Sequence, residues 1–218
     1  STNAMAYHPS ARHQKLLEES PSPFIDTDEE FRQEMGETAV QAAKAVDYVN
    51  AGTVEYLVDK DKNFYFLEMN TRLQVEHPVT EYLTGIDIVK YQLLIASGMA
   101  LDFTQQDVQF NGHAIEARVY AEDPETFIPS PGTITGLKFP EPGPGIRIDH
   151  ALKENATVPP YYDPLLAKVI AWATERSRAS NRLSKALTEF QIEGVKTTIP
   201  VNLKILNNEV FRDGSIDT

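Results

Sequence analysis

The segment from Glu68 to His77 carries side chains that can do chemistry at regular spacing. Every second position is polar, and these positions are Glu68, Asn70, Arg72, Gln74 and Glu76. Because side chains alternate between the two faces of an extended strand, the pattern predicts one polar face along the whole segment. Carboxylate and amide oxygens at one end suit cations, and a guanidinium further along suits an oxyanion. A solvated strand face is the alternative that the alternation alone favours.

Two strand-like runs precede and enter this segment, and together they predict a β-hairpin. The runs 53–58 and 64–70 contain many β-branched and aromatic residues, and the polar stretch 59–63 separates them. We expect Asp59 to pair with Phe64 around a four-residue loop.

This register predicts that two glutamates share one face of the hairpin. Glu55 falls opposite Glu68, and Asn70, opposite Thr53, lies two residues further along the same face. Like charges directly across a strand pair are destabilising, so an uncompensated pair would be an unfavourable choice. Mg²⁺ or Mn²⁺ would remove that cost, because these ions bind carboxylate and carbonyl oxygens and keep other positions for water and phosphates. The three polar side chains are therefore a candidate metal site.

The composition limits the class of protein. The chain has 218 residues, of which 41% are hydrophobic and 24% are charged, as in ordinary soluble proteins with one large or two small domains. The net charge of −12 argues against a nucleic-acid partner, and no apolar stretch approaches the ~20 residues of a membrane-spanning helix. The chain contains no cysteine, which excludes disulfides, thiol nucleophiles and cysteine-ligated zinc.

The elements that must position these residues follow from capping and periodicity. Thr27 and Glu30 form a capping box that predicts a helix start, and Gly52 is expected to end this helix. Its apolar stripe consists of Phe31, Met35, Ala39, Ala42, Val46 and Val49. After the hairpin, Pro78 leads into a short helical run, and a second amphipathic helix is predicted over 87–97.

The second half changes character and predicts an α+β fold. Residues 99–111 are polar and irregular, so we expect a domain boundary there, with domains over 7–110 and 111–218. Strands are predicted over 114–121, 133–139, 145–151 and 165–173, followed by helices over 177–190 and from Pro200 to about Asn208. Residues 1–6 are expected to be a cloning remnant rather than a signal peptide, because they have no basic region and no apolar core.

The segment 68–81, E-M-N-T-R-L-Q-V-E-H-P-V-T-E, resembles the signature of biotin carboxylases. These are the ATP-grasp enzymes of acetyl-, propionyl- and methylcrotonyl-CoA carboxylases and their relatives. Further matches follow in order: R-H-Q-K at 12–15, A-G-T-V-E-Y at 51–56, E-A-R-V-Y-A-E-D-P at 116–124, P-S-P-G at 129–132 and V-P-P-Y-Y-D at 158–163. The resemblance implies the second lobe of an ATP-grasp fold followed by the biotin carboxylase C-terminal domain.

The resemblance implies a role for each residue at the nucleotide end. Two Mg²⁺ or Mn²⁺ ions bridging the ATP phosphates would be held by Glu55, Glu68 and Asn70. The ATP-binding set would be His13, Lys15, Glu55, Leu57 and Glu68. Lys15 would face the reacting anion as well, and Leu57 would lie on the adenine side.

The resemblance also implies the residues that act on bicarbonate and biotin. Bicarbonate would be bound by Arg72, Gln74, the backbone amide of Val75 and Glu76. Glu76 would be the general base that starts carboxyphosphate formation, and Arg118 would bind biotin and stabilise its enolate. The catalytic set would be Lys15, Arg72, Glu76 and Arg118.

Ordinary structural roles are the alternatives to these assignments. Lys15 and His13 could be exposed loop residues, as most Lys and His side chains are. Arg118 shares the polar side of its predicted strand with Glu116 and Tyr120, so a plain Arg–Glu pair is its alternative.

The resemblance has limits that bear on activity. Residues 7–11 depart from the family, which puts nucleotide contacts from that stretch in doubt. The family's N-terminal domain and its glycine-rich lid have no counterpart in these 218 residues. We therefore expect the isolated chain to be inactive.

The family's partners are implied in the same way. They are a biotin carboxyl carrier domain bearing the biotin, a second copy in a homodimer and a carboxyltransferase subunit, with no nucleic acid and no membrane. The implied compartment is the cytoplasm, with the mitochondrion as the alternative, and acyl-CoA carboxylases serve fatty acid metabolism. The final acceptor of the carboxyl group is left open.

Two rival functions remain. An ATP-grasp ligase of carbamoyl phosphate or purine synthesis would share the Glu55, Glu68 and Asn70 set but would not be expected to carry the Arg72 to Glu76 pattern or the Arg118 segment. A module kept for assembly would dimerise without responding to Mg-ATP.

Overall fold

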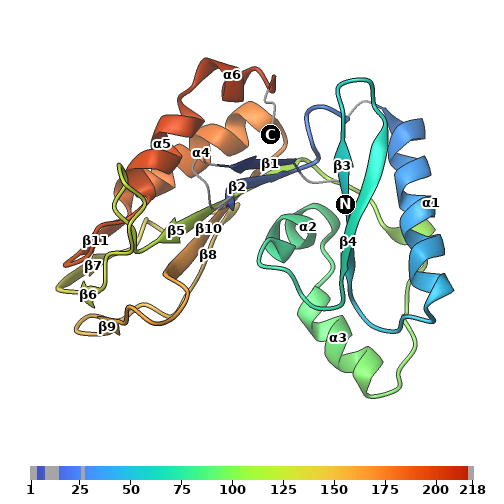
Figure 1. Cartoon of the computed structure of the whole chain (residues 1–218), viewed down its shortest axis with the longest axis horizontal. Coiled ribbons are helices and arrows are strands. Elements are labelled where there is room, and N and C mark those ends of the chain that lie inside the picture. The colour runs from blue at the N-terminus through green and yellow to red at the C-terminus, as the bar shows by residue number, and fades with distance from the viewer. Residues whose placement is uncertain (1–3, 8–14, 26–27, 216–218) are drawn as a thin grey trace.

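The computed structural model describes residues 4–7, 15–25 and 28–215. Its centre is a five-stranded antiparallel sheet, beside which a separate β-hairpin stands (Figure 1). The strand order is β1 (Ala4–Tyr7), β2 (Lys15–Ser20), β5 (His113–Tyr120), β10 (Leu165–Ala173) and β8 (Ile146–His150). The combination of helices with antiparallel sheets confirms the predicted α+β class. Because β2 pairs with β5, the sheet joins residues that are far apart in the sequence.

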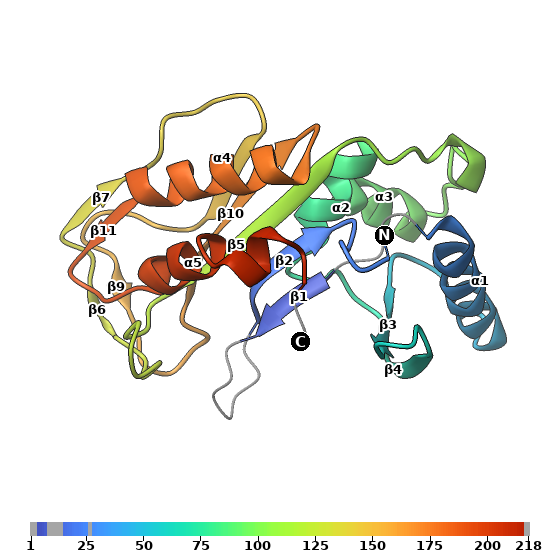
Figure 2. The ribbon, with the colours of Figure 1, turned by 90° about the horizontal axis from the view of Figure 1, so that it is seen from above.

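One face of the sheet holds the main hydrophobic core. Ile115 and Val169 point from the sheet into this core, and neither is exposed. The helices α4 (Arg176–Glu189) and α5 (Ile199–Leu206) cover this face, and Leu183 of α4 is also fully buried. Figure 2, a view from above, shows both helices over the sheet. The predicted helices over 177–190 and from Pro200 are thereby confirmed.

The opposite face of the sheet receives the short helix α2 (His77–Thr84). Val79 and Leu83 of this helix pack against Ala114 and Ile170 of the sheet. This contact anchors the first turn of α2, which directly follows the polar segment of the candidate site.

The helix α3 (Ile88–Ala96) comes next and confirms the prediction over 87–97. Asp87 caps it, because its carboxylate accepts a hydrogen bond of 2.8 Å from the Lys90 N–H. Gly85 takes the left-handed conformation that ends α2, with a φ of 70°.

The hairpin strands β3 (Thr53–Val58) and β4 (Phe64–Asn70) pair as predicted at their functional end. Glu55 lies opposite Glu68, and Thr53 lies opposite Asn70. The predicted register is therefore confirmed at the candidate metal site.

The turn of the hairpin differs from the prediction. Val58, not Asp59, pairs with Phe64, and the Asp59 N–H donates to the Asn63 carbonyl at 2.9 Å. The Asp59 carboxylate accepts hydrogen bonds from backbone N–H groups in the turn, and Lys62 takes a φ of 61°. An aspartate whose carboxylate accepts hydrogen bonds from backbone N–H groups further along the turn favours this turn geometry. A register shift between Glu55 and Tyr56 compensates for the difference, so the register at Glu55 is unchanged.

The helix α1 (Glu29–Ala45) is capped and ended differently from the prediction. Asp28 is its N-cap and accepts a hydrogen bond of 3.1 Å from the Phe31 N–H. The predicted cap, Thr27, lies outside the described residues. The helix ends well before Gly52, so the predicted end was wrong.

The predicted apolar stripe of α1 is buried only in its first turns. Phe31 and Met35 are buried and pack against the hairpin, which contributes Tyr56 to this small core. Val46 and Val49 follow the end of the helix and are 65% and 74% exposed. The helical periodicity predicted that these positions would be buried, but no element of the described chain covers them.

Short elements complete the described chain. The predicted strand over 133–139 was wrong as one strand, because it divides into β6 (Gly132–Thr133) and β7 (Gly136–Lys138). The remaining elements are η1 (Gln105–Asp107), β9 (Thr157–Val158), β11 (Gln191–Glu193) and α6 (Glu209–Arg212). Within the described ranges, no helix combines the length and apolar character needed to cross a membrane.

Candidate active site

The polar segment after Asn70 is not a strand. β4 ends at Asn70 and residues 71–76 are irregular, so the expected continuous strand face was wrong. Glu76 is the N-cap residue of α2, but its side chain makes no capping hydrogen bond. Its carboxylate is instead free to point toward the sheet. The irregular segment therefore lets Gln74 and Glu76 meet different neighbours, which one flat strand face would not allow.

The proposed metal end forms a compact group. The Asn70 side-chain nitrogen donates to Oε1 of Glu55 and to Oε1 of Glu68, each at 2.9 Å. The Gln74 amide nitrogen also donates to Oε1 of Glu55. Three side chains that the sequence places on one face thus converge, and positively polarised N–H groups occupy the space between the carboxylates.

The chemistry of this group fits a hard divalent cation. Among the described residues, no cluster of three or more His, Cys, Asp or Glu side chains is suited to hold a metal. Glu55, Glu68 and Asn70 instead offer two carboxylates and one amide, and Mg²⁺ would complete its shell with phosphate oxygens and water. Rotation of the Asn70 amide by half a turn would present its oxygen in place of its nitrogen. The metal role of these three residues stays a prediction.

Lys15 connects the metal end to the rest of the site. Its ammonium group lies 3.3 Å from Oε1 of Glu76 and 3.9 Å from Oε2 of Glu55. Its side chain extends from the start of β2 and is only 20% exposed. The alternative of an ordinary exposed loop lysine is wrong. His13, its predicted companion, lies outside the described residues.

Arg118 occupies the opposite side of Glu76. One terminal nitrogen of its guanidinium donates to Oε2 of Glu76 at 2.9 Å and also contacts Oε1 of Glu18. The other terminal nitrogen donates to the Tyr120 hydroxyl at 3.3 Å. Burial lowers the pKa of Arg118, but Glu18 and Tyr120 raise it, and the pKa stands above its ordinary value. Arg118 is therefore a fixed cation paired with Glu18 and Glu76, not with Glu116 as the alternative supposed.

Arg72 stands apart from this group of contacts. It is exposed, and its guanidinium donates to the adjoining Leu73 carbonyl at 3.3 Å. Its side chain still lines the large cavity of the site. The bicarbonate role of Arg72 stays a prediction, and it requires a different side-chain conformation that brings the guanidinium next to Gln74 and Glu76.

Contacts to the backbone hold the irregular segment in place. The Lys168 ammonium group donates to the Val75 carbonyl at 2.8 Å and lies 3.5 Å from a carboxylate oxygen of Asp149. Nδ1 of His77 lies 2.8 Å from the Gln74 carbonyl, and burial lowers the pKa of His77. The Val75 carbonyl is thus contacted by Lys168 of the sheet, and the Gln74 carbonyl by His77 of α2. The Val75 amide remains a predicted bicarbonate ligand.

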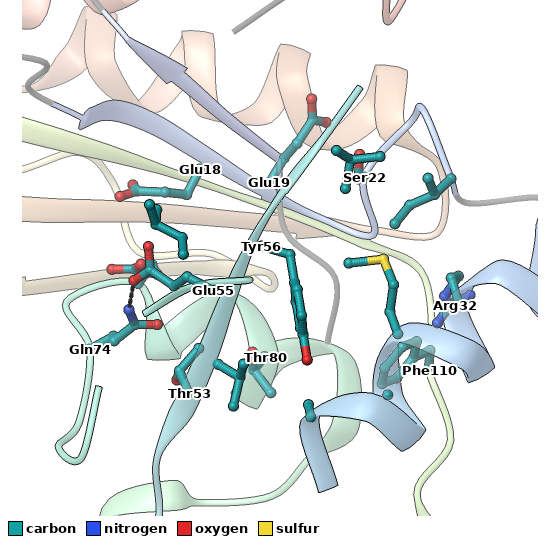
Figure 3. A pocket seen from close by; sticks show the side chains of 18 of the residues that line it. Glu18, Glu19, Ser22, Arg32, Thr53, Glu55, Tyr56, Gln74, Thr80 and Phe110 are labelled. Atoms are coloured by element: carbon teal, nitrogen blue, oxygen red, sulfur yellow. Dashed lines mark hydrogen bonds between the residues drawn. The ribbon is translucent and has the colours of Figure 1, made fainter. Parts of the chain in front are cut away.

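A cavity of ≈ 1370 Å³ lies between the hairpin, α1 and the sheet. Its lining includes Glu18, Glu55, Gln74 and Leu57, and Leu57 is 58% exposed. Figure 3 shows Glu18, Glu55 and Gln74 on one side of this cavity, with Tyr56 near its centre and with Arg32 and Phe110 on the other side. This space is ample for a nucleotide, with the acidic group at one end.

Two buried acids near the site, Glu18 and Glu116, were not predicted as site residues from the sequence. Glu18 of β2 lies directly opposite Glu116 of β5, and the two are 1% and 0% exposed. Burial raises the pKa of Glu18 to about 7, against the lowering effect of Arg118. Burial and the neighbouring Glu18 raise the pKa of Glu116. An acid between apolar residues of a strand is the sequence signal at Ile115-Glu116-Ala117, whereas Glu18 is followed by Glu19 and carries no such signal, and the pairing of the two acids follows only from the sheet.

Two family models match the chain. Residues 116–218 match the biotin carboxylase C-terminal domain, and residues 2–104 match the ATP binding domain of the carbamoyl-phosphate synthase L chain.

Relatives of known activity are similar over almost the whole chain. Biotin carboxylase 2 of Bacillus subtilis is 53% identical over 95% of this chain and 46% of its own length. A solved biotin carboxylase subunit of pyruvate carboxylase is 48% identical, with a TM-score of 0.89, and the match covers 93% of this chain and 45% of that one. The chain therefore spans less than half the length of these two relatives.

A second solved structure agrees with this likeness. The biotin carboxylase domain dimer of Hydrogenobacter thermophilus 2-oxoglutarate carboxylase, in complex with MgADP, ADP and bicarbonate, superposes with a TM-score of 0.92. It is 46% identical, and the match covers 97% of this chain and 46% of that one. These similarities show that the chain belongs to the biotin carboxylase family.

Proposed function

We propose that the protein to which this chain belongs carboxylates biotin on a carrier, using ATP and bicarbonate and releasing ADP and phosphate. The observation that carries the proposal is the position of Glu76. This carboxylate is 3% exposed and lies between Lys15 and Arg118, next to the group formed by Glu55 and Asn70. These positions support the proposal that one continuous site contains a base, two cations and a metal-binding face.

At the nucleotide end, the proposed metal ligands would place ATP. Glu55, Glu68 and Asn70 would hold Mg²⁺ or Mn²⁺ against the phosphates, and a pair of ions is the arrangement we propose. Lys15 would contact the nucleotide and the transferring phosphoryl group, where its charge offsets the negative charge of the phosphates. Leu57 would meet the adenine ring across the cavity that it lines, and His13 would complete the ATP-binding set.

In the first step, Glu76 would act on bicarbonate. Arg72, Gln74, the Val75 amide and Glu76 would bind the anion, with the Arg72 guanidinium turned away from the Leu73 carbonyl. Glu76 would accept the bicarbonate proton while a bicarbonate oxygen bonds to the γ-phosphorus and the bond from this phosphorus to ADP breaks. The products of this step are carboxyphosphate and ADP.

In the second step, Arg118 would act on biotin. Carboxyphosphate separates into CO₂ and phosphate, and the phosphate takes the proton from the reacting nitrogen of biotin. The enolate oxygen that develops would face the Arg118 guanidinium, a preorganised cation that is 9% exposed. The biotin nitrogen then bonds to the carbon of CO₂.

The wider assembly is part of the proposal. We infer a biotin carrier domain, a carboxyltransferase and a homodimer, supported by one relative that is a subunit of a larger carboxylase and by another that is a domain dimer. The final acceptor differs between these relatives, which belong to a pyruvate carboxylase and a 2-oxoglutarate carboxylase. The division of this chain into domains at 110 and 111 also remains a proposal.

A turnover assay tests the function. The full-length protein, given MgATP, a biotinylated carrier and ¹⁴C-bicarbonate, should label the carrier in an ATP-dependent way, whereas the isolated 218-residue chain should not. Glu76→Gln should lower kcat by about 10²–10⁴-fold, the usual worth of a general base. Glu154→Gln is the matched control, because Glu154 is exposed and outside the cavity.

The same assay separates the rival ligase. Labelled carbamoyl phosphate or a labelled purine precursor, with no label on biotin, would replace the proposed function by another ATP-grasp reaction. Label on biotin that survives Glu76→Gln undiminished would refute the role of Glu76 alone.

A further inference from the structure

The reaction proposed above leaves two buried acids without a role. Glu18 and Glu116 face each other across β2 and β5, on the side of the sheet that faces Glu76 and α2. Two carboxylates in this position repel each other when both are ionised. Burial makes the repulsion stronger, because the side chains are 1% and 0% exposed. A pair of this kind needs both a cation and a proton.

The cation is Arg118. Glu18 contacts the same terminal guanidinium nitrogen that donates to Glu76. Glu18 approaches it from the sheet, whereas Glu76 approaches it from the segment before α2. Tyr120 holds the other terminal nitrogen at 3.3 Å. The Arg118 guanidinium is therefore held by Glu18 and Tyr120 of the sheet and by Glu76 of the segment before α2. Of these three residues, only Glu76 takes part in the proposed reaction.

The proton belongs to Glu116. Within the described residues, neither of its carboxylate oxygens has a hydrogen-bond or ion-pair partner. The oxygens of Glu18 also lack a hydrogen-bond partner, but Glu18 has the ion pair with Arg118, which an ionised carboxylate shielded from water would require. Burial, together with the negative charge of Glu18, raises its pKa, and Glu76 acts in the same direction. Lys168 and Arg118 act in the opposite direction, and their effect is smaller than that of burial. A neutral Glu116 removes the repulsion and, above about pH 7, where Glu18 is ionised, leaves the charge of Glu18 for Arg118.

The charged groups that surround Glu18 and Glu116 lie on β2, β5, β10 and the segment before α2. Lys15 of β2 pairs with Glu76, and Lys168 of β10 pairs with Asp149 of β8. These two lysines are thus engaged by other acids. Arg118 is the cation that contacts Glu18 directly.

We propose that Glu18 is a positioning residue for Arg118, and that a neutral Glu116 behind it allows Glu18 to act as the single fixed anion on the guanidinium. The inference rests on the proposed function in one respect. When Glu76 accepts the bicarbonate proton, its charge disappears and its hold on Arg118 weakens. Glu18 then keeps Arg118 in place for the negative charge that forms on biotin.

The first experiment does not depend on turnover. In the 218-residue chain, nuclear magnetic resonance should show slowly exchanging guanidinium signals from Arg118. Glu18→Gln should remove or broaden these signals at pH 8, whereas Glu116→Gln should keep them, because a glutamine resembles a protonated carboxyl. The two variants are matched, since they make the same change at directly paired positions. Equal spectra for the two variants would overturn the inference.

The second experiment measures the reaction in the full-length enzyme. Glu18→Gln should lower kcat by about 10- to 100-fold, the scale of losing a hydrogen bond to a charged group, and leave the KM for ATP unchanged. Glu18→Asp keeps the charge and should recover part of the rate, which a purely structural role would not produce. Glu116→Gln should stay within about twofold of the wild type. Equal losses in Glu18→Gln and Glu116→Gln would refute the positioning role.

The outcomes separate this inference from the proposed function. If the wild type does not label biotin, the proposed function fails together with the catalytic part of the inference, while the guanidinium signals still decide whether Glu18 holds Arg118. If Glu18→Gln does not fold, the ¹³C chemical shift of the Glu116 carboxyl in the wild type shows whether Glu116 is protonated and so tests the inference. A protonated carboxyl at pH 7 supports the inference, and a titration near the ordinary value of 4.5 overturns it.

Discussion

The buried pair of acids predicts an unusual dependence of stability on pH. The perturbation is Glu18→Gln, which removes one ionisable group and retains its size. Burial raises the pKa of Glu18 from 4.5 to about 7. The folded chain therefore holds a proton between these pH values that the unfolded chain releases. The free energy of unfolding should fall as the pH rises through this range and should level off above it.

The size of the effect follows from the shift. A difference of about 2.5 pH units corresponds to about 3 kcal/mol, at 1.36 kcal/mol for each unit. Solvent screening reduces this figure little, because Glu18 is only 1% exposed. The slope belongs to Glu18 and Glu116 together, since two interacting acids titrate as a pair. Glu18→Gln should thus gain stability relative to the wild type by about 3 kcal/mol between pH 4.5 and pH 8.

Urea unfolding at several pH values measures this difference. Trp172, the single tryptophan, lies in β10 and donates to the Asn111 carbonyl at 2.7 Å, so its fluorescence should report the loss of the sheet. Glu154→Gln is the control and should follow the wild type across the range, because its side chain is exposed. A difference between wild type and Glu18→Gln that stays flat from pH 4.5 to pH 8 would refute the reasoning. So would a difference that grows toward low pH.

Three further predictions concern the surroundings of the site. Asn70→Asp replaces a donor to two carboxylates by a third negative charge, so the thermal midpoint should fall without metal and should rise more than that of the wild type on addition of MgCl₂. An equal response to MgCl₂ in both proteins would argue against a metal site there. Val79→Ala should lower the free energy of unfolding by about 2 kcal/mol in urea titrations, because Val79 is fully buried between α2 and the sheet. Lys168→Met removes the donor to the Val75 carbonyl, and amide hydrogen exchange over 71–77 should become about tenfold faster, with unchanged rates in α4 as the control.

Local sequence signals located most of the elements. Asp87 marked the start of α3, because a capping carboxylate close to the backbone acts within one turn. The hairpin was likewise predictable from two β-prone runs, and its register at Glu55 and Glu68 was correct. The turn was misjudged by one residue because Asp59 bonds to its own backbone. The compensating shift beside Tyr56 had no sequence signal that we recognised.

Periodicity alone misled where no neighbour was available. The polar alternation continues past Asn70, but β4 ends there, because the segment is held by Lys168 and by α2 instead of by a strand partner. The apolar stripe of α1 continues to Val49, which is exposed. A sequence pattern predicts which side chains could share a face. Whether they do depends on whether another element packs against that face.

The sequence by itself determined the chemical inventory of this protein. It supplied the acids, amides and cations of the site, the spacing that brings Glu55 to Glu68, and the family resemblance. Only the tertiary structure decided that Arg118 lies between Glu76 and Glu18, because β2 and β5 come from distant parts of the chain and meet only in the sheet. The physical reason is that hydrogen bonding within a hairpin or a helix turn is local, whereas burial and charge pairing depend on which distant strands become neighbours.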